Sequence, residues 1–366
     1  MTLILSNAEI TEILPVKQCL ARIEECYREM GCGQAGNRPR SDIYGPVHHH
    51  GRYVLKTMDG LLPRFEAAAI RLNSDVVCWR HGPDGLRKEK QPAAPGSKFC
   101  GLILLFSTRN GEPLAIMPDG IIQRLRVACT NALGAKYMAP SSAGVYGLIG
   151  SGWQASGQAL AMTAVLPLRE IRIYSPTRAN RERLARELKA QLGIGVSAVD
   201  SARVAVRWAD VVGIATNSVT PVIEAEWVAP YAHVTCIKEL ELGDGILERS
   251  ALNVVNTRIG RLANYIVGKG ENPIYDHDPQ EGLADDLTKV RGSRRVIVDL
   301  EKLPDLGELV SGRISPPPAG VLTCFVNVMG HGIQFAALGA LAYENAKARG
   351  IGREIPTDWL LESETP

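Results

Sequence analysis

The stretch VYGLIGSGWQASGQAL, residues 145–160, decides the fold. An apolar run typical of a buried strand ends at a glycine turn, and an alanine-rich stretch typical of a helix follows. Such a turn places the helix N-terminus over the carboxyl end of the strand, where free backbone N–H groups and the helix dipole favour an anion. With Ala155 in the third position, it has the G-x-G-x-x-A form of a dinucleotide-binding fingerprint. We therefore expect cofactor contacts from Gly150, Ser151, Gly152, Trp153 and Gln154.

The surroundings of this turn predict an α/β fold with a Rossmann dinucleotide-binding domain. Strand-like and helix-like segments alternate up to RRVIVDL, residues 294–300, which is a candidate last strand. This alternation is typical of a parallel sheet with helices on its faces. We place the Rossmann domain at residues 126–324 and a second, α+β domain at residues 1–125 and 325–366. The second domain combines a helix at residues 16–30, several strands and a long helix at residues 330–348, which follows a turn-rich connector that begins near residue 304.

The segments after the second and fourth strands are expected to contact the cofactor. An acidic residue after the second strand would bind the ribose 2′-hydroxyl of NAD. The chain has YSPTR there, and its hydroxyls and guanidinium favour NADP(H) over NAD(H). Two alternatives stay open: Arg178 only begins the next helix in solvent, and Trp153 either walls the nicotinamide or covers the helix start. The expected contacts are Ser175, Thr177 and Arg178 after the second strand, and Thr216, Asn217 and Ser218 after the fourth.

Composition excludes several classes of function. The 366 residues are 45% hydrophobic and 22% charged, and the net charge of +2 lacks the basic excess of a nucleic-acid-binding protein. No apolar run approaches a membrane span, and the N-terminus has no basic region typical of a signal peptide. The eight cysteines lack CxxC pairs, which favours reduced thiols in a cytoplasmic protein. Histidines 48–50 have no convergent ligands nearby, so we expect no metal site, although one of them could act as an acid or base.

Several segments resemble the ornithine cyclodeaminase/mu-crystallin family. They are GEPLAIMPDGIIQRLRVACTNALGAKYMAP at 111–140, GLIGSGWQA at 147–155, ADVVGIATNSVTPVI at 209–223 and NVMGHGIQFAALGALAYENAKARGIG at 327–352. The resemblance implies a Rossmann domain, and a substrate-binding and dimerisation domain formed by the N-terminal region and the final helix, and hence a homodimer. It also implies hydride exchange, in the cleft between the domains, between a nicotinamide and the α-carbon of a small amino, imino or keto acid.

The resemblance assigns two arginines and shows a first departure from the family pattern. The family's carboxylate-binding arginines fall on Arg40, in RPR, and on Arg126, in IIQRLRVACT. The family's substrate lysine falls on Arg71, whose guanidinium can bind a carboxylate but does not easily release a proton. Lys56 is the candidate proton donor, and the alternative is that it is a strand lysine in solvent. For Arg40 the alternative is a surface ion pair. For Arg126 the alternative is an arginine on a helix face.

The second departure concerns the reaction type. The aspartate that cyclodeaminases carry after the fifth strand is absent from HVTCIKELELGDG, where Glu239 and Glu241 lie nearest to its position. We take Glu239 as the candidate. The sequence therefore favours an NAD(P)-dependent oxidoreductase that acts on a C–N bond, with three arginines suited to more than one carboxylate. The alternatives are an ornithine or lysine cyclodeaminase with catalytic NAD, and a non-enzymatic protein that binds NADP and a small ligand.

Overall fold

The computed structural model describes residues 1–47, 51–82, 85–218, 220–258, 264–268, 270–272 and 299–364. The chain divides into two compact units. Unit 1 contains Met1–Gln123, Ile259–Arg291 and Gly330–Pro366, and unit 2 contains Arg124–Arg258 and Gly292–Met329. Histidines 48–50 and residues 294–298 of the candidate last strand lie outside the described residues.

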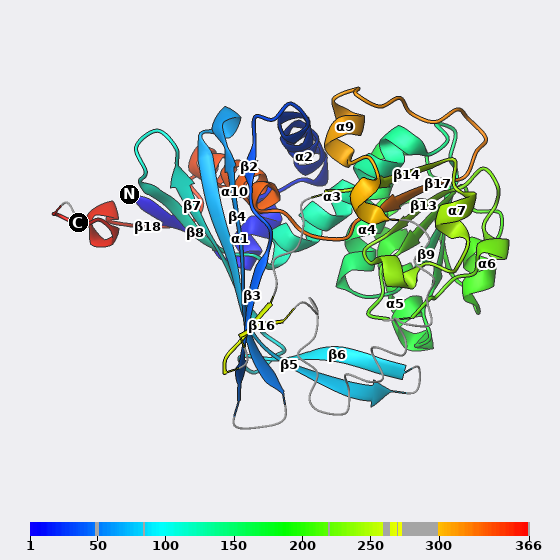
Figure 1. Cartoon of the computed structure of the whole chain (residues 1–366), viewed down its shortest axis with the longest axis horizontal. Coiled ribbons are helices and arrows are strands. Elements are labelled where there is room, and N and C mark those ends of the chain that lie inside the picture. Colours follow the sequence, from blue (N-terminus) through cyan, green and yellow to red (C-terminus); the bar gives the residue numbers. More distant parts are fainter. Residues whose placement is uncertain are drawn as a thin grey trace. The chain divides into compact units, whose positions relative to one another are not determined.

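Among its described residues, unit 2 is built on a seven-stranded sheet whose neighbouring strands are all parallel. The strand order is β11-β10-β9-β12-β13-β17-β14, and Figure 1 labels β9, β13, β17 and β14 of this sheet. Because β10 and β12 flank β9 on opposite sides, the order reverses at β9, as in a Rossmann domain. The predicted fold class is confirmed. The strands are β9 (Val145–Ile149), β10 (Glu170–Tyr174), β11 (Gly195–Ala198), β12 (Val211–Ile214), β13 (His233–Cys236), β14 (Leu252–Val255) and β17 (Thr323–Val326).

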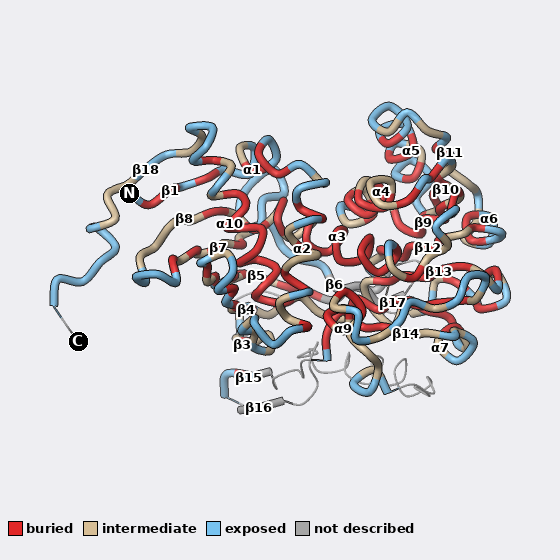
Figure 2. Tube along the Cα trace, turned by 90° about the horizontal axis from the view of Figure 1, so that it is seen from above, coloured by how far each residue is buried: buried red, intermediate tan, exposed pale blue. Residues whose placement is uncertain are grey.

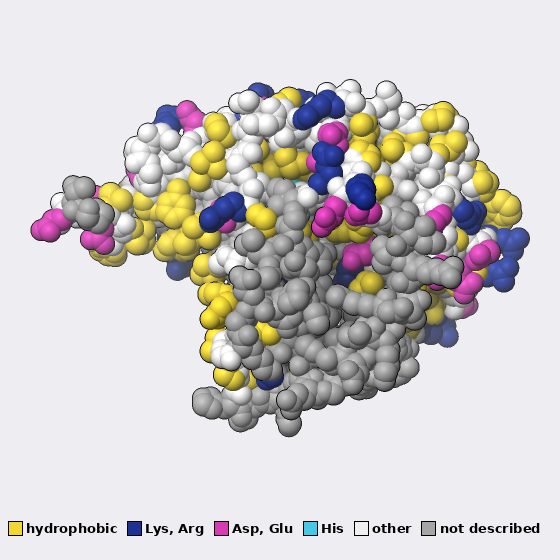
Figure 3. All heavy atoms as spheres, in the orientation of Figure 1, with side chains coloured by type: hydrophobic (Ala, Val, Ile, Leu, Met, Phe, Trp, Pro, Cys, Tyr) yellow, Lys and Arg dark blue, Asp and Glu magenta, His cyan; other side chains and the backbone are white. Residues whose placement is uncertain are grey.

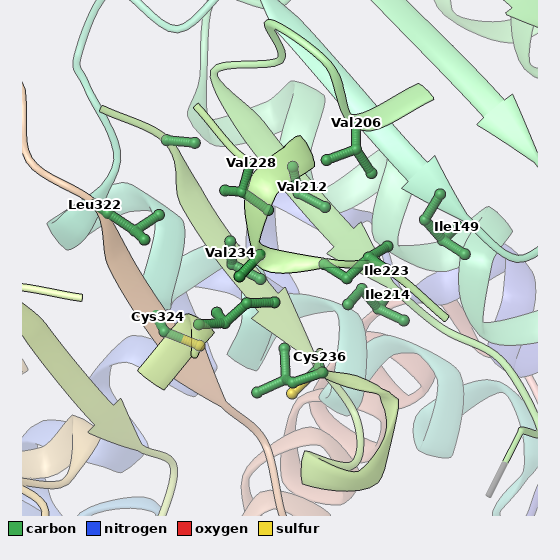
Figure 4. Close-up of a cluster of buried hydrophobic side chains, with 14 of the residues drawn as sticks. Ile149, Val206, Val212, Ile214, Ile223, Val228, Val234, Cys236, Leu322 and Cys324 are labelled. Carbon is green, nitrogen blue, oxygen red and sulfur yellow. The ribbon is translucent and has the colours of Figure 1, made fainter. Parts of the chain in front are cut away.

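Strands in the middle of this sheet are apolar on both faces, as parallel strands covered by helices must be. Every residue of β12 and β13 is buried. Val212, Ile214, Val234 and Cys236 from these two strands meet in one apolar cluster (Figure 4). The helices associated with unit 2 are α3 (Gly120–Met138, which begins in unit 1), α4 (Trp153–Val165), α5 (Arg178–Leu192), α6 (Ala202–Val206), α7 (Ile246–Arg249) and α9 (Leu306–Val310).

One strand of unit 2 differs from the sequence-based expectation. The region after residue 304 was expected to be a connector that leads directly to the last helix. It instead contains β17, which pairs with both β13 and β14 and lies between them. Four residues preceded by the prolines at 316–318 are too short to show a strand period, so tertiary pairing rather than local pattern creates this strand.

Unit 1 is built on a largely antiparallel sheet of order β16-β15-β3-β4-β5-β7-β8-β1-β18, with β2 paired to β4 and β6 paired to β5. The turn at residues 108–112 joins β7 to β8, which pair in antiparallel fashion. The strands are β1 (Thr2–Ile4), β2 (Gly36–Asn37), β3 (Ser41–Pro46), β4 (Arg52–Leu62), β5 (Ala67–Gly82), β6 (Gly85–Gln91), β7 (Cys100–Ser107), β8 (Pro113–Pro118), β15 (Asn264–Ile266), β16 (Gly270–Asn272) and β18 (Arg353–Ile355).

Helix α10 (Gly332–Arg349) covers one face of this sheet and is buried along most of its length (Figure 2). Its first turn packs directly on β4, because a Cβ on Gly60 would lie 2.1 Å from the backbone nitrogen of Ile333. Helices α1 (Asn7–Ile13) and α2 (Val16–Gly31) pack against α10. No helix in the described part of the chain has the length and apolar character needed to cross a membrane.

Candidate functional site

The glycine turn after β9 is fixed against the ends of two neighbouring strands. Gly150 has φ +120°, a conformation that L side chains rarely adopt. Its N–H donates to the carbonyl of Tyr174 at 2.8 Å, and a Cβ at this position would lie 2.2 Å from the carbonyl oxygen of Ala215. Only glycine fits here, so the sequence of the motif sets the path by which the chain enters α4.

The next glycine of the motif leaves space at the start of α4. Gly152 is the N-cap residue, and its side-chain position would meet nothing within 4 Å. Within the described part of the chain, no side chain caps the N–H groups in the first turn of this helix. A phosphate can approach the backbone closely at such a position, which fits the anion expected from the sequence.

Hydroxyl groups join the glycine turn to the segment after β10. The Oγ atoms of Ser151 and Ser175 lie 2.7 Å apart, and Ser175 is buried. Arg181, which sequence reasoning missed, donates to the carbonyl of Ser175 at 2.9 Å and to Asp200 at 3.1 Å. Its position in the first turn of α5, three residues after Arg178, would have been the only signal.

The exposed residues after β10 lie at the start of α5. Thr177 is the N-cap residue of this helix. Arg178 is exposed and donates from Nε to Glu182 at 2.6 Å, one helical turn later. The guanidinium expected at a 2′-phosphate is therefore paired with a carboxylate in this structure.

The segment after β12 is held by residues that follow β13. The N–H and hydroxyl of Thr216 donate to the same oxygen of Glu241, at 2.8 and 2.6 Å, and Ser218 donates from its N–H to the Thr216 hydroxyl. Lys238 donates to the carbonyl of Ser218 at 3.2 Å. Burial raises the pKa of the Glu241 carboxyl, although Lys238 and the two Thr216 hydrogen bonds act in the opposite direction.

Glu241, rather than Glu239, is thus the glutamate bonded to the predicted cofactor segment. Both lie in the short helix η3 (Glu239–Glu241), but Glu239 is only partly buried. Asn217 is exposed between the two bonded residues of the segment. The sequence alone gives no signal that distinguishes the two glutamates, and they differ only in the structure, where Glu241 is buried and Glu239 is partly buried.

In unit 1, polar residues occupy inward positions of two neighbouring strands. Alternate side chains of a strand share one face, and Arg71, Asn73 and Asp75 of β5 are all buried on the face that also holds the apolar core. Lys56 of β4 lies opposite Asn73 in the register and is buried as well. Burying so many polar groups together is costly unless each one is paired, so this cluster suggests a function.

Arg71 is bonded to a carboxylate that sequence reasoning missed. Its Nε and terminal nitrogen both lie 2.7 Å from the same oxygen of Asp119, and Asn73 donates to that oxygen at 3.0 Å. The approach depends on Gly101, where a Cβ would lie 2.1 Å from Asp119 Oδ1. The Phe335 ring of α10 lies 5.3 Å from the guanidinium carbon of Arg71. Asp119 thereby fixes this guanidinium in place.

A second ion pair lies beside the first. Lys56 donates to Asp75 at 3.0 Å, and the partly exposed Lys90 contacts the same oxygen at 2.9 Å. Burial lowers the pKa of the Lys56 ammonium; Asp75 opposes this effect, whereas Lys90 and Arg40 add to it. Arg40 itself is bonded to Asp42 at 2.7 Å. Arg40, Lys56 and Arg71 are therefore brought together in unit 1.

Arg126, the remaining arginine expected at the substrate, lies on α3 and is buried. It belongs to unit 2, whereas Arg40, Lys56 and Arg71 belong to unit 1. The roles of all four residues stay predictions.

A family model described as the ornithine cyclodeaminase/mu-crystallin family matches residues 1–350. The chain belongs to this family. The resemblance drawn from the sequence is confirmed. Members of the family include an alanine dehydrogenase of Archaeoglobus fulgidus, 25% identical over 366 residues that cover 97% of this chain and 98% of the relative. They also include the ketimine reductase mu-crystallin of Rattus norvegicus, 28% identical over 214 residues that cover 57% of this chain and 63% of the relative.

Among solved structures, the fold is similar to that of the Δ1-pyrroline-2-carboxylate reductase of Thermococcus litoralis in complex with NADH and L-proline. The TM-score is 0.75 at 24% identity, with 97% of this chain and all of the other covered. The family thus contains proteins named as dehydrogenases and reductases as well as cyclodeaminases.

Proposed function

We propose that the chain is an NAD(P)-dependent oxidoreductase that transfers a hydride at the α-carbon of a small amino or imino acid. The observation that carries this proposal is the buried cationic cluster of unit 1. Among the described residues, the carboxylates of Asp42, Asp75 and Asp119 hold Arg40, Lys56 and Arg71 near one another. Cations fixed in this way suit the carboxylate of an amino, imino or keto acid.

The cofactor fits the turn after β9. Gly150, Ser151 and Gly152 provide a backbone that a pyrophosphate could approach, and Ser175, bonded to Ser151, would offer its hydroxyl to the adenosine ribose. When bound, the nicotinamide would supply or accept the hydride. The Thr216–Ser218 segment would border the same cofactor, with Glu241 and Lys238 fixing its backbone.

The proposed roles of the unit 1 residues follow from their chemistry. Arg71, fixed by Asp119, would orient a substrate carboxylate, and Arg40 would attract a second one; Arg126 of α3 is proposed to contact a carboxylate too. Arg71 cannot donate a proton near neutral pH, because a guanidinium stays charged. Lys56, whose pKa is lowered, is the group that would protonate the substrate nitrogen during imine reduction.

We propose NADP(H) as the preferred cofactor, because the segment directly after β10, residues 175–178, contains no acid. Binding of a 2′-phosphate by Arg178 would require the phosphate to replace the carboxylate of Glu182. That exchange costs little, because an exposed ion pair between residues one helical turn apart is weak. A comparison of NADPH and NADH dissociation constants tests this preference, and tighter binding of NADH would refute it.

A cyclodeaminase is less well supported than an oxidoreductase. The acid that lies nearest to the expected catalytic position is Glu239 or Glu241, and the Glu241 carboxylate is already bonded to Thr216. The deciding experiment monitors NADPH and NADH oxidation with a panel of cyclic imino acids and of keto acids paired with amines. Release of ammonia from ornithine or lysine without net cofactor consumption would support a cyclodeaminase instead. Tight cofactor binding without turnover would indicate a non-enzymatic binding protein. If Arg126 binds the substrate carboxylate, Arg126→Ala should abolish turnover.

We further propose that unit 1 provides the substrate-binding and dimerisation domain, within residues 1–125 and 325–366, and that the protein is a homodimer. The sheet face opposite α10 exposes apolar side chains on adjacent strands: Ile43 of β3, Leu61 of β4 and Ile70 of β5 are 41%, 42% and 39% exposed. Figure 3 shows groups of hydrophobic side chains on the left half of the described surface. Leu61→Glu with Ile70→Glu should convert a dimer to monomers in analytical ultracentrifugation; an unchanged mass would refute this interface.

A further inference from the structure

Arg124 and Trp153 form a contact at the start of α4 that the proposed reaction does not yet use. The guanidinium carbon of Arg124 lies 4.5 Å from the centre of the Trp153 ring. Trp153 is the first residue of α4, directly after Gly152, and is 54% exposed. Both residues belong to unit 2.

The stem of Arg124 runs along the first turn of α4 toward the glycine turn. A Cβ on Gly157 would lie 2.8 Å from Cγ and 3.3 Å from Cδ of Arg124, so glycine is needed there for the side chain to pass. Gly157 follows Trp153 by about one helical turn, and residues at this spacing share one face of a helix. The side chain therefore extends from Gly157 toward the N-terminus of α4 and ends over the Trp153 ring.

Among the described residues, no carboxylate is paired with this guanidinium. Arg71 is paired with Asp119 and Arg181 with Asp200. For Arg124, Nε is buried without a hydrogen-bond partner among the described residues, and burial alone lowers its pKa, with no carboxylate opposing the effect. A partly buried cation without an anion is costly, and a bound anion would remove that cost.

We infer that Arg124 binds the pyrophosphate of the dinucleotide at the N-terminus of α4, and that Trp153 is a positioning residue that holds the guanidinium over this turn. The inference deepens the proposed function and rests on its cofactor. The phosphates would then contact both the first-turn N–H groups of α4 and a planar guanidinium, which binds phosphate oxygens in pairs. This role of Trp153 differs from the two alternatives left open by the sequence, a wall for the nicotinamide and a cover for the helix start. Here its ring supports a cation that faces the phosphates.

The test measures binding of nicotinamide-free probes by calorimetry: ADP-ribose, its 2′-phosphate, and adenosine. Arg124→Gln should weaken binding of the two ADP-ribose probes by about 10- to 100-fold, the loss of one or two charge-assisted hydrogen bonds, and leave adenosine binding within about twofold. Arg124→Lys should recover part of the loss because it restores the charge. Arg183→Gln, which breaks an exposed helical ion pair in the same unit, is the matched control and should change nothing.

Trp153 is tested in combination with Arg124. Trp153→Ala should weaken ADP-ribose binding in the wild-type background but not in Arg124→Gln, whereas Trp153→Phe should retain most of it, because a phenyl ring also attracts a guanidinium. Equal affinity of wild type and Arg124→Gln for ADP-ribose, or an equal loss for adenosine, would overturn the inference and leave the proposed function intact. Failure of the wild-type protein to bind any of the probes would overturn both.

Discussion

Replacement of Lys56 by methionine is the sharpest test of the proposed chemistry. Methionine keeps the length and apolar character of the side chain and removes only the ammonium. A positioned general acid contributes about 100- to 10,000-fold to a rate, so kcat for imine reduction should fall by about that factor in Lys56→Met. Carboxylate binding by Arg71 should persist, so KM should change far less than kcat.

The structure supplies both the expected cost in stability and the matched control. Removing one partner of a buried ion pair costs about 3 to 5 kcal/mol when the other charge is left alone. Here Asp75 retains Lys90 at 2.9 Å, so we expect a smaller loss, about 1 to 3 kcal/mol. Lys90→Met removes the other ammonium from the same carboxylate, at a side chain that is 43% exposed, and should leave kcat within about threefold.

The pH dependence gives an independent readout. The pKa of Lys56 is lowered by burial, and imine reduction requires its protonated form. Activity should therefore fall as pH rises through this lowered pKa, at a pH below that at which an ordinary lysine titrates, and the same limb should be absent from Lys56→Met. Steady-state rates of the wild type, Lys56→Met and Lys90→Met between pH 6 and pH 10 test whether Lys56 is the proton donor. A Lys56→Met enzyme with near wild-type kcat and an unchanged alkaline limb would refute the assignment.

Three further predictions concern Glu241, Gly101 and the cofactor. The folded-state pKa of Glu241 is raised, so its contribution to stability is present at low pH and is lost as pH rises through that pKa. Glu241→Gln should therefore flatten the dependence of the unfolding free energy on pH, measured by urea titrations. An unchanged slope would contradict this prediction. Gly101→Ala places a Cβ 2.1 Å from a carboxylate oxygen and should cost about 1 to 3 kcal/mol in the same assay, whereas Gly36→Ala, with its nearest contact at 3.4 Å, should be nearly neutral. Glu182→Gln frees Arg178 and should tighten NADPH but not NADH by about two- to threefold in fluorescence titrations; equal effects on both would argue against a 2′-phosphate contact.

The sequence predicts the features of this chain that are encoded locally. The strand, the glycine turn and the helix of the cofactor site lie within residues 145–160, and each has its own pattern. Arg71 and Asp119 are separated by 48 positions in the chain, and no periodicity links them. Their pairing depends on how β5, β7 and β8 align, and on a glycine in β7 that only the register reveals.

A weaker signal for the polar cluster was nevertheless present in the strand sequence. In AAAIRLNSDVV, residues 67–77, the charged or amide side chains of Arg71, Asn73 and Asp75 occur at every second position, in phase with Ala69 and Val77. A strand whose polar residues share the phase of its core residues buries those polar residues. This phase predicts a buried charged group on β5 but cannot name its partners, which are supplied by β4, β6 and the residue after β8.

The buried and partly buried cations of the two units predict that different anions stabilise the protein. Unit 1 holds the cations of Lys56 and Arg71 buried in one cluster, and unit 2 holds Arg124, which no carboxylate of the described residues neutralises. Burying these cations costs folding free energy that a bound anion would return, so a carboxylate ligand should stabilise the protein through the cluster of unit 1 and a dinucleotide through Arg124. In thermal unfolding, ADP-ribose should raise the midpoint of the wild type but much less that of Arg124→Gln. A small dicarboxylate should raise the midpoint of the wild type and of Arg124→Gln equally, and should lose its effect in Arg71→Met. Loss of both effects in a single variant would mean that the two charges do not act as separate anion sites.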